Sequence, residues 1–109
     1  MLPYYGFMQK EIIVSNGYDT EDVQLARYLK ALGHPARIAI MKLLSHRDTC
    51  ICNDIVQELP LAQSTVSQHL KELKSAGLIQ GNITPPSVKY CINRENWAKA
   101  ITLIEKFLQ

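Results

Sequence analysis

A face of hydroxyl, amide and cationic side chains runs along residues 63–75, where the helical spacing of apolar residues is strong. At about 100° per residue, Val66, Leu70 and Leu73 fall within about 60° of one another and form an apolar stripe. The polar side chains opposite or beside that stripe are Ser64, Ser67, Gln68, Lys71 and Ser75. A glutamine amide forms two hydrogen bonds with adenine, serine reaches several base edges, and lysine suits guanine or phosphate. The pattern indicates a helix that reads DNA, with an ordinary solvated face as the alternative.

The first turn of a DNA-reading helix points into the major groove, so its residues lie nearest the bases. In this chain they are Gln63, Ser64 and Thr65. A hairpin that follows such a helix acts as a wing against the DNA backbone. The hairpin expected at residues 78–92 of this chain carries Lys89 as its cation, with neutral donors at Asn82 and Ser87. Because phosphate contacts dominate affinity, we expect a modest contribution from each wing.

Short helices and one hairpin must position these residues. Apolar spacing and capping residues predict helices at about 20–32, 35–45, 55–59, 63–76 and 94–108, with a brief strand at 50–52. In the first helix, Val23, Ala26 and Leu29 belong to the expected apolar stripe. Residues 78–92 predict a hairpin interrupted at Gly81-Asn82. Two helices joined by a tight turn and followed by a hairpin describe a winged helix-turn-helix, a mainly α fold with a small β-hairpin.

Length and composition fit one small globular domain. The chain has 109 residues, of which 47% are hydrophobic and 20% charged, and its net charge of +2 is weak support for a polyanionic partner. We expect residues 1–17, which are rich in aromatic side chains, to form an arm and residues 18–109 to form the domain. No apolar run approaches the roughly 20 residues of a membrane span and no signal-peptide pattern is visible, so we expect a cytoplasmic protein. No nucleophile and base share a visible pocket, so we do not expect an enzyme.

Several stretches resemble the ArsR-type winged-helix repressors. Residues 32–38 (LGHPARI) are similar to the opening motif of that family, and residues 61–73 (LAQSTVSQHLKEL) to its recognition helix. With further similarity in the hairpin, the match covers about residues 20–108. The recognition motif adds His69 to the candidate DNA-binding residues. Arg37, in the opening motif, is a candidate phosphate contact or internal ion-pair partner. One departure is Ala62, where the family often has a serine that caps the helix.

The resemblance implies a homodimer that binds a palindromic double-stranded DNA operator and represses transcription until an unidentified signal releases it. In the family, the first and last helices form the dimer interface. The apolar residues that match it here are Leu25, Leu29, Trp97, Ile101, Ile104, Phe107 and Leu108. The alternative function is a winged-helix module that binds proteins and does not read DNA.

Many members of the family release DNA when a metal binds a Cys-x-Cys motif, which Cys50-Ile51-Cys52 resembles. Counting without gaps from the flanking motifs places the family's ligand positions on Ile51 and Asn53 instead. Cys50 and Cys52 then occupy core positions as small hydrophobic residues, and we expect no cofactor. The alternative is a thiol site, because in this fold the segment usually pairs with the wing strand that carries Cys91. Three converging thiolates would suit zinc, arsenite or an oxidative switch.

Overall fold

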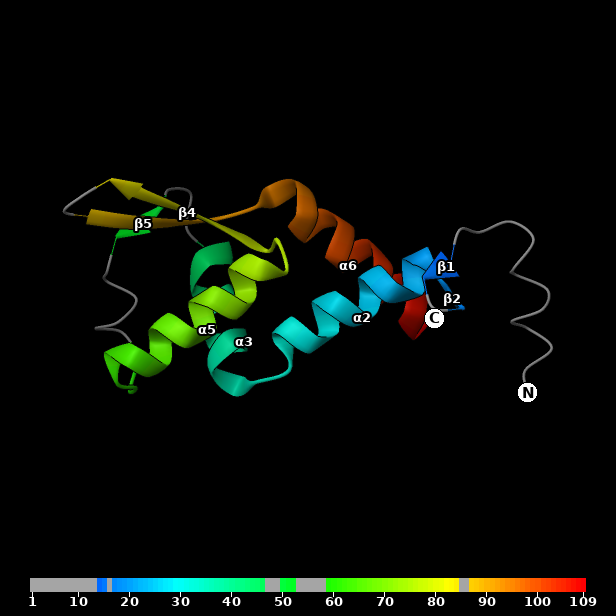
Figure 1. The fold of residues 1–109 in the computed structure, drawn as a ribbon, viewed down its shortest axis with the longest axis horizontal. Helices are drawn as coiled ribbons and strands as arrows, with labels where there is room; N and C mark the ends of the chain where they lie inside the picture. Colours follow the sequence, from blue (N-terminus) through cyan, green and yellow to red (C-terminus); the bar gives the residue numbers. More distant parts are fainter. Residues whose placement is uncertain (1–13, 16, 47–49, 53–58, 85–86) are drawn as a thin grey trace.

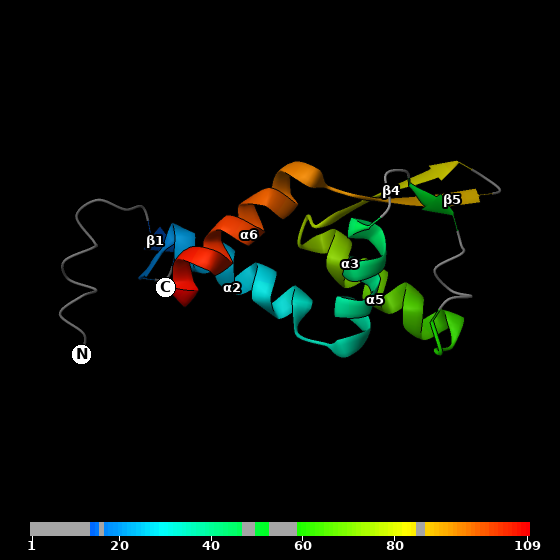
Figure 2. The same ribbon diagram turned by 180° about the vertical axis from the view of Figure 1, so that it is seen from behind.

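The computed structural model describes residues 14–15, 17–46, 50–52, 59–84 and 87–109. Its elements are, in chain order, β1 (Val14–Ser15), β2 (Tyr18–Asp19), α2 (Thr20–Leu32), α3 (Pro35–Ser45), β3 (Ile51–Cys52), α5 (Gln63–Ser75), β4 (Ile79–Thr84), β5 (Ser87–Ile92) and α6 (Arg94–Leu108). Figures 1 and 2 show α3, α5 and the β3–β5 sheet at one end, and α2 beside α6 at the other. The predicted mainly helical winged fold is confirmed. The helix expected at 55–59 and most of the arm lie outside the described residues.

Side-chain hydrogen bonds cap the N-termini of three of the four described helices. Asp19 accepts a hydrogen bond from the backbone amide two residues ahead at 2.7 Å, and His34 Nδ1 accepts one from the amide two residues ahead at 3.0 Å. Asn93 accepts one from the amide three residues ahead at 3.0 Å. Ala62, before α5, has no side chain that can do this. Such a missing cap costs about 1 kcal/mol, so α5 depends on packing for its stability.

The end of α5 and the start of the wing are joined by a glycine turn. Gly77 has a φ of +84°, a left-handed conformation that glycine adopts without strain. The Leu78 amide donates to the Leu73 carbonyl at 3.1 Å, and the Gly77 amide donates to that of Lys74 at 2.9 Å. From α6, Asn96 Nδ2 donates to the Gly77 carbonyl at 2.9 Å. The turn therefore sets the direction in which the wing leaves the helix.

The wing is a continuous hairpin inside a three-stranded antiparallel sheet. β5 is the central strand, with β3 on one side and β4 on the other. The predicted interruption at Gly81-Asn82 is wrong, because β4 pairs with β5 at every position from Ile79 to Thr84. Gly81 lies opposite Tyr90, and a Cβ placed on it would lie 3.5 Å from the tyrosine ring. That distance is an ordinary van der Waals contact, so the strand continues past Gly81 with the Tyr90 ring beside it.

One hydrophobic core connects the two ends of the molecule. Its buried residues come from α2, α3, α5, β4 and α6: Tyr28, Ala31, Ile40, Met41, Leu44, Val66, Leu70, Leu73, Leu78, Ile79 and Ala100. α2 enters this core through Tyr28, which is 2% exposed, and the expected stripe is only partly correct. Leu29 is 39% exposed and Ala26 is also exposed. α2 thus packs Tyr28 and Ala31 against its own chain and leaves Ala26 and Leu29 exposed.

No helix in the part of the chain that the structure describes is long and apolar enough to cross a membrane.

Candidate nucleic-acid interface

α5 presents the polar face that the sequence predicts. Val66 and Leu73 are completely buried and Leu70 is 3% exposed, so these three side chains hold the helix against α3 and β4. The exposed face carries Ser64, Thr65, Ser67, Gln68 and Lys71. The side chain of Gln63 lies outside the described part of the structure. Packing on one side therefore presents a row of hydroxyl, amide and ammonium groups to solvent on a rigid helix.

Gln68 already has a partner within α5. Its Nε2 donates to Glu72 Oε1 at 3.3 Å, between two exposed side chains. A carboxylate only accepts hydrogen bonds, so this contact turns the amide nitrogen of Gln68 toward Glu72 and leaves its oxygen free. Pairing with adenine through both amide atoms requires this contact to break. The sequence reasoning missed Glu72, although its position four residues after Gln68 is the signal for such a pair.

His69 does not belong to the exposed face, which corrects the expectation that it contacts DNA. It is 9% exposed, and its ring centroid lies 4.3 Å from that of His34 with the ring planes tilted by 44°. Its Nδ1 is buried and has no hydrogen-bond partner among the described residues. Burial, the neighbouring His34 and the charge of Arg37 lower the pKa of His69. The ring acts as a neutral packing group between α5 and the start of α3.

Arg37 ties α3 to the end of α2. Its Nη1 donates to the carbonyl oxygens of Lys30 at 3.3 Å and Ala31 at 3.2 Å. These carbonyls lie in the last turn of α2, where helical carbonyls lack partners within the helix. Among the described residues, the hydrogen-bond partners of Arg37 are thus backbone oxygens and not the carboxylate of an internal ion pair. Contact between Arg37 and a phosphate stays a prediction.

The described part of the wing carries one cation, and α5 has another close to the wing. Lys89 is exposed on β5, opposite Asn82 on β4. The side chains of Asn82 and Ser87 lie outside the described part, so their roles stay predictions. Lys74, on α5, is a cation that the sequence reasoning missed: a Cβ on Gly81 would lie 3.4 Å from its Nζ. Lys74 therefore bridges α5 and the wing, and only the turn at Gly77 brings it there.

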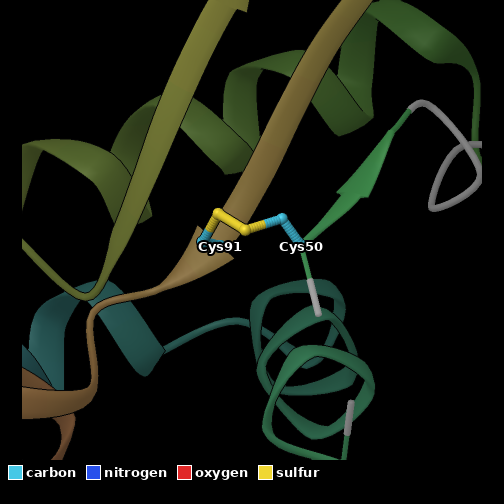
Figure 3. The surroundings of a disulfide bond; sticks show 2 residues. All are labelled: Cys50 and Cys91. Carbon is cyan, nitrogen blue, oxygen red and sulfur yellow. A yellow bond between two sulfur atoms is a disulfide. The ribbon is translucent and has the colours of Figure 1, made fainter. Parts of the chain in front are cut away.

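Cys50 is exposed and bonded to Cys91, so the expectation that it lies in the core is wrong. Figure 3 shows the bond joining β5 to the chain just before β3. Counting residues placed Cys50 at a core position, but pairing with β5 turns its side chain to the neighbouring strand. The side chain of Cys52 lies outside the described part. Among the described residues, no three His, Cys, Asp or Glu side chains gather to hold a metal ion.

Large apolar side chains remain exposed on α2 and α6. Leu29 is 39% exposed, Ile101 40%, Phe107 64% and Leu108 74%. Leu25 and Ile104 are half-buried, and Trp97 packs against the core of its own chain. Of the residues expected at a dimer interface, Trp97 therefore supports the core of its own chain, Leu25 and Ile104 are half-buried, and the other four are exposed to solvent. A separate apolar hollow between α2 and α6 is lined by Gln24, Ala98, Lys99, Thr102 and Leu103.

Known proteins resemble this chain over the elements that build this surface. A family model described as bacterial regulatory protein, arsR family, matches residues 34–80, from the cap of α3 into β4. An uncharacterized HTH-type transcriptional regulator of Mycobacterium tuberculosis is 31% identical over 83 residues, which cover 76% of this chain and 73% of that protein. The arsenical resistance operon repressor of Staphylococcus xylosus is 32% identical over 72 residues, which cover 66% of this chain and 68% of that protein.

A solved structure agrees with this assignment. HlyU from Vibrio cholerae is 26% identical and matches with a TM-score of 0.66, over 84% of this chain and 100% of that one. The range that the family model matches includes the whole of α5. This chain belongs to the arsR family of bacterial regulatory proteins and is a DNA-binding transcriptional regulator.

Proposed function

We propose that the protein is a repressor that binds a specific double-stranded DNA operator as a homodimer and leaves it in response to a signal. The observation that carries this proposal is the two-sided character of α5. Val66 and Leu73 are completely buried, while Ser64, Ser67 and Gln68 are exposed. The first turn of α5 enters the major groove, and the wing lies near the flanking phosphates through Lys89. The name of the Staphylococcus xylosus relative, an operon repressor, supports repression.

The exposed apolar face of α2 and α6 supports the homodimer. Phe107 and Leu108 are more than half exposed, and Leu29 and Ile101 continue the surface. A large exposed apolar patch is typical of an interaction surface. A second copy related by two-fold symmetry covers this face and places two α5 helices in successive major grooves of a palindromic operator. Because the operator is chromosomal DNA, we place the protein in the cytoplasm, and this binding needs no cofactor.

Binding to the DNA upstream of its own gene tests the proposal. We expect tight binding that weakens steeply with salt, because lysines displace counterions from phosphates. Gln68→Ala should reduce the preference for this DNA over a random duplex. Gln109→Ala, at the far end of the molecule, is the matched control and should leave that preference unchanged.

Affinity that does not depend on salt, together with no preference among DNA sequences, would contradict the proposal. That result would favour a protein-binding winged helix.

A further inference from the structure

The disulfide between Cys50 and Cys91 joins two segments whose relative position matters for reading DNA. Cys50 comes directly before β3, and Cys91 lies on β5, the central strand of the sheet and the strand that carries Lys89. We propose that this pair is a reversible thiol–disulfide site, and that its oxidation state sets how firmly the wing is held for DNA binding. This inference rests on the proposed function and names a signal to which it responds.

The backbone places the two cysteines opposite each other whether or not they are bonded. β3 pairs antiparallel with β5, Ile51 opposite Tyr90 and Cys52 opposite Lys89. One residue further along the same register, Cys50 faces Cys91. Their Cα atoms are 4.4 Å apart, which is the usual spacing of a pair without hydrogen bonds in an antiparallel ladder and lies within the disulfide range. The bond can therefore form and open without a rearrangement of the sheet.

The site is open to small reagents. Cys50 is exposed and Cys91 is half-buried. Exposed disulfides are more readily reduced than buried structural ones, and in a compartment that keeps thiols reduced they usually serve as redox sensors. This accessibility distinguishes the pair from a cross-link sealed inside the core.

A low-molecular-weight disulfide such as oxidised glutathione supplies the oxidant. The thiolate of one cysteine attacks the small disulfide, forms a mixed disulfide and expels one small thiolate. The thiolate of the second cysteine then attacks the protein sulfur of that mixed disulfide, which forms the Cys50–Cys91 bond and expels the second small thiolate. The two protein sulfurs lose two electrons, the small disulfide gains them, and the two protons of the cysteines pass to the released thiolates.

The bond encloses the DNA-reading part of the chain. The two cysteines are separated by 41 positions, and between them lie α5 and β4. Without the bond, β3 is an edge strand held to β5 by two residue pairs. With the bond, the segment directly before β3 is also fixed to the strand that carries Lys89. Binding then orders fewer residues, and such preorganisation increases affinity. We expect the oxidised protein to bind DNA on the order of fivefold more tightly than the reduced one.

The test measures the affinity of the full chain for its own upstream DNA across a series of reduced-to-oxidised glutathione ratios. Alkylation of free thiols reports the oxidation state in the same samples. Affinity should follow the fraction of the Cys50–Cys91 bond. Cys91→Ser should remain at the reduced value at every ratio. Cys52→Ser, a matched control outside the bond, should respond as the unaltered chain does.

Each outcome separates the inference from the proposed function. Tight and equal binding by both oxidation states would overturn the inference and leave the repressor intact. A bond that persists throughout the glutathione series would also overturn it, because the disulfide would then be a permanent cross-link. Absence of salt-dependent DNA binding in both states would instead overturn the proposed function. Slower hydrogen exchange of the β5 amides in the oxidised form would support the proposed holding of the wing independently of DNA.

Discussion

The two ends of this molecule differ in what they leave uncovered. At the end that holds α5 and the wing, Val66, Leu73 and Leu78 are completely buried, and the exposed face of α5 is polar. At the α2–α6 end, Phe107 is 64% exposed and Leu108 is 74% exposed. The first end has buried its apolar surface within its own chain and suits a polar partner. The second leaves apolar surface exposed to solvent and suits a partner with a matching apolar surface, such as another copy.

Packing, more than charge, connects the two ends. Tyr28 of α2 and Ala100 of α6 belong to the same core as Leu73 of α5. On the surface, Lys106 Nζ lies 3.0 Å from Glu21 Oε1, but this pair joins α6 to α2 at one end, and both side chains are more than half exposed. Exposed ion pairs contribute little to stability, so the core carries the connection. Predictions that separate the two ends follow from this difference.

The largest effect, on the free energy of unfolding, is expected from a change in the core beneath α5. Leu73→Ala should lower the free energy of unfolding by about 3–5 kcal/mol, because it leaves a cavity beneath α5. Urea denaturation measures the change. Leu108→Ala, at the other end, removes the same atoms from a 74% exposed position and should cost far less in dilute protein. Equal losses for the two variants would contradict the contrast between the ends.

A charge on the apolar face should weaken self-association. Phe107→Glu removes an aromatic ring that a partner would bury, a burial worth about 1.5–3 kcal/mol, or at least about tenfold in the dimer dissociation constant. Analytical ultracentrifugation measures this constant. Glu105→Gln, on the same helix, is the control for altered charge without loss of apolar surface. An unchanged dimer in Phe107→Glu would show that the partner binds elsewhere.

Loss of the α5 amide should affect the choice of sequence. Gln68→Ala should cost about 1–3 kcal/mol against the preferred base at one operator position and leave other positions alone. Affinities for a set of operators with single base changes measure this. Glu72→Gln replaces the carboxylate that holds Gln68 and should change specificity less, because the Gln68 amide is still present. A uniform loss at every position would contradict base reading by Gln68.

Removal of the wing cation should weaken binding to all sequences alike. Lys89→Ala should lower affinity for specific and random duplexes and reduce the slope of log affinity against log salt by about one. Lys99→Ala, on α6 away from α5, is the matched control. An unchanged slope would show that Lys89 does not contact a phosphate.

The smallest effect is expected from pH. The pKa of His69 is lowered in the folded chain, chiefly by burial, so the unfolded chain binds the proton more readily. Stability is therefore full above the ordinary histidine pKa and falls as the pH drops below it. The melting temperature should decrease from about pH 7.5 to about pH 5.5, and His69→Gln should make this decrease smaller. A decrease of the same size in His69→Gln would assign it to other groups.

Local pattern was sufficient for most elements and for the exposed polar face of α5. The stripe of Val66, Leu70 and Leu73 and the helix at 94–108 appear in the structure as the sequence predicts. Each depends on residues a few positions apart, which helical geometry brings together without help from the rest of the chain. The sequence predicted a break at Gly81-Asn82, because the pairing of Gly81 with Tyr90 cannot be deduced from neighbouring residues.

Residue pattern alone was enough to predict the order of helices and hairpin, the polar side of α5 and the apolar side chains of the last helix. Folding of the whole chain was needed to place His69 against the tilted ring of His34, Arg37 at the end of α2 and Cys50 opposite Cys91. Each of these contacts joins residues from different elements, and the register between β3 and β5 decides which side chains face each other. Counting along the sequence contains no information on that register, and a shift of one residue in such a pairing turns every side chain to the other face of the sheet.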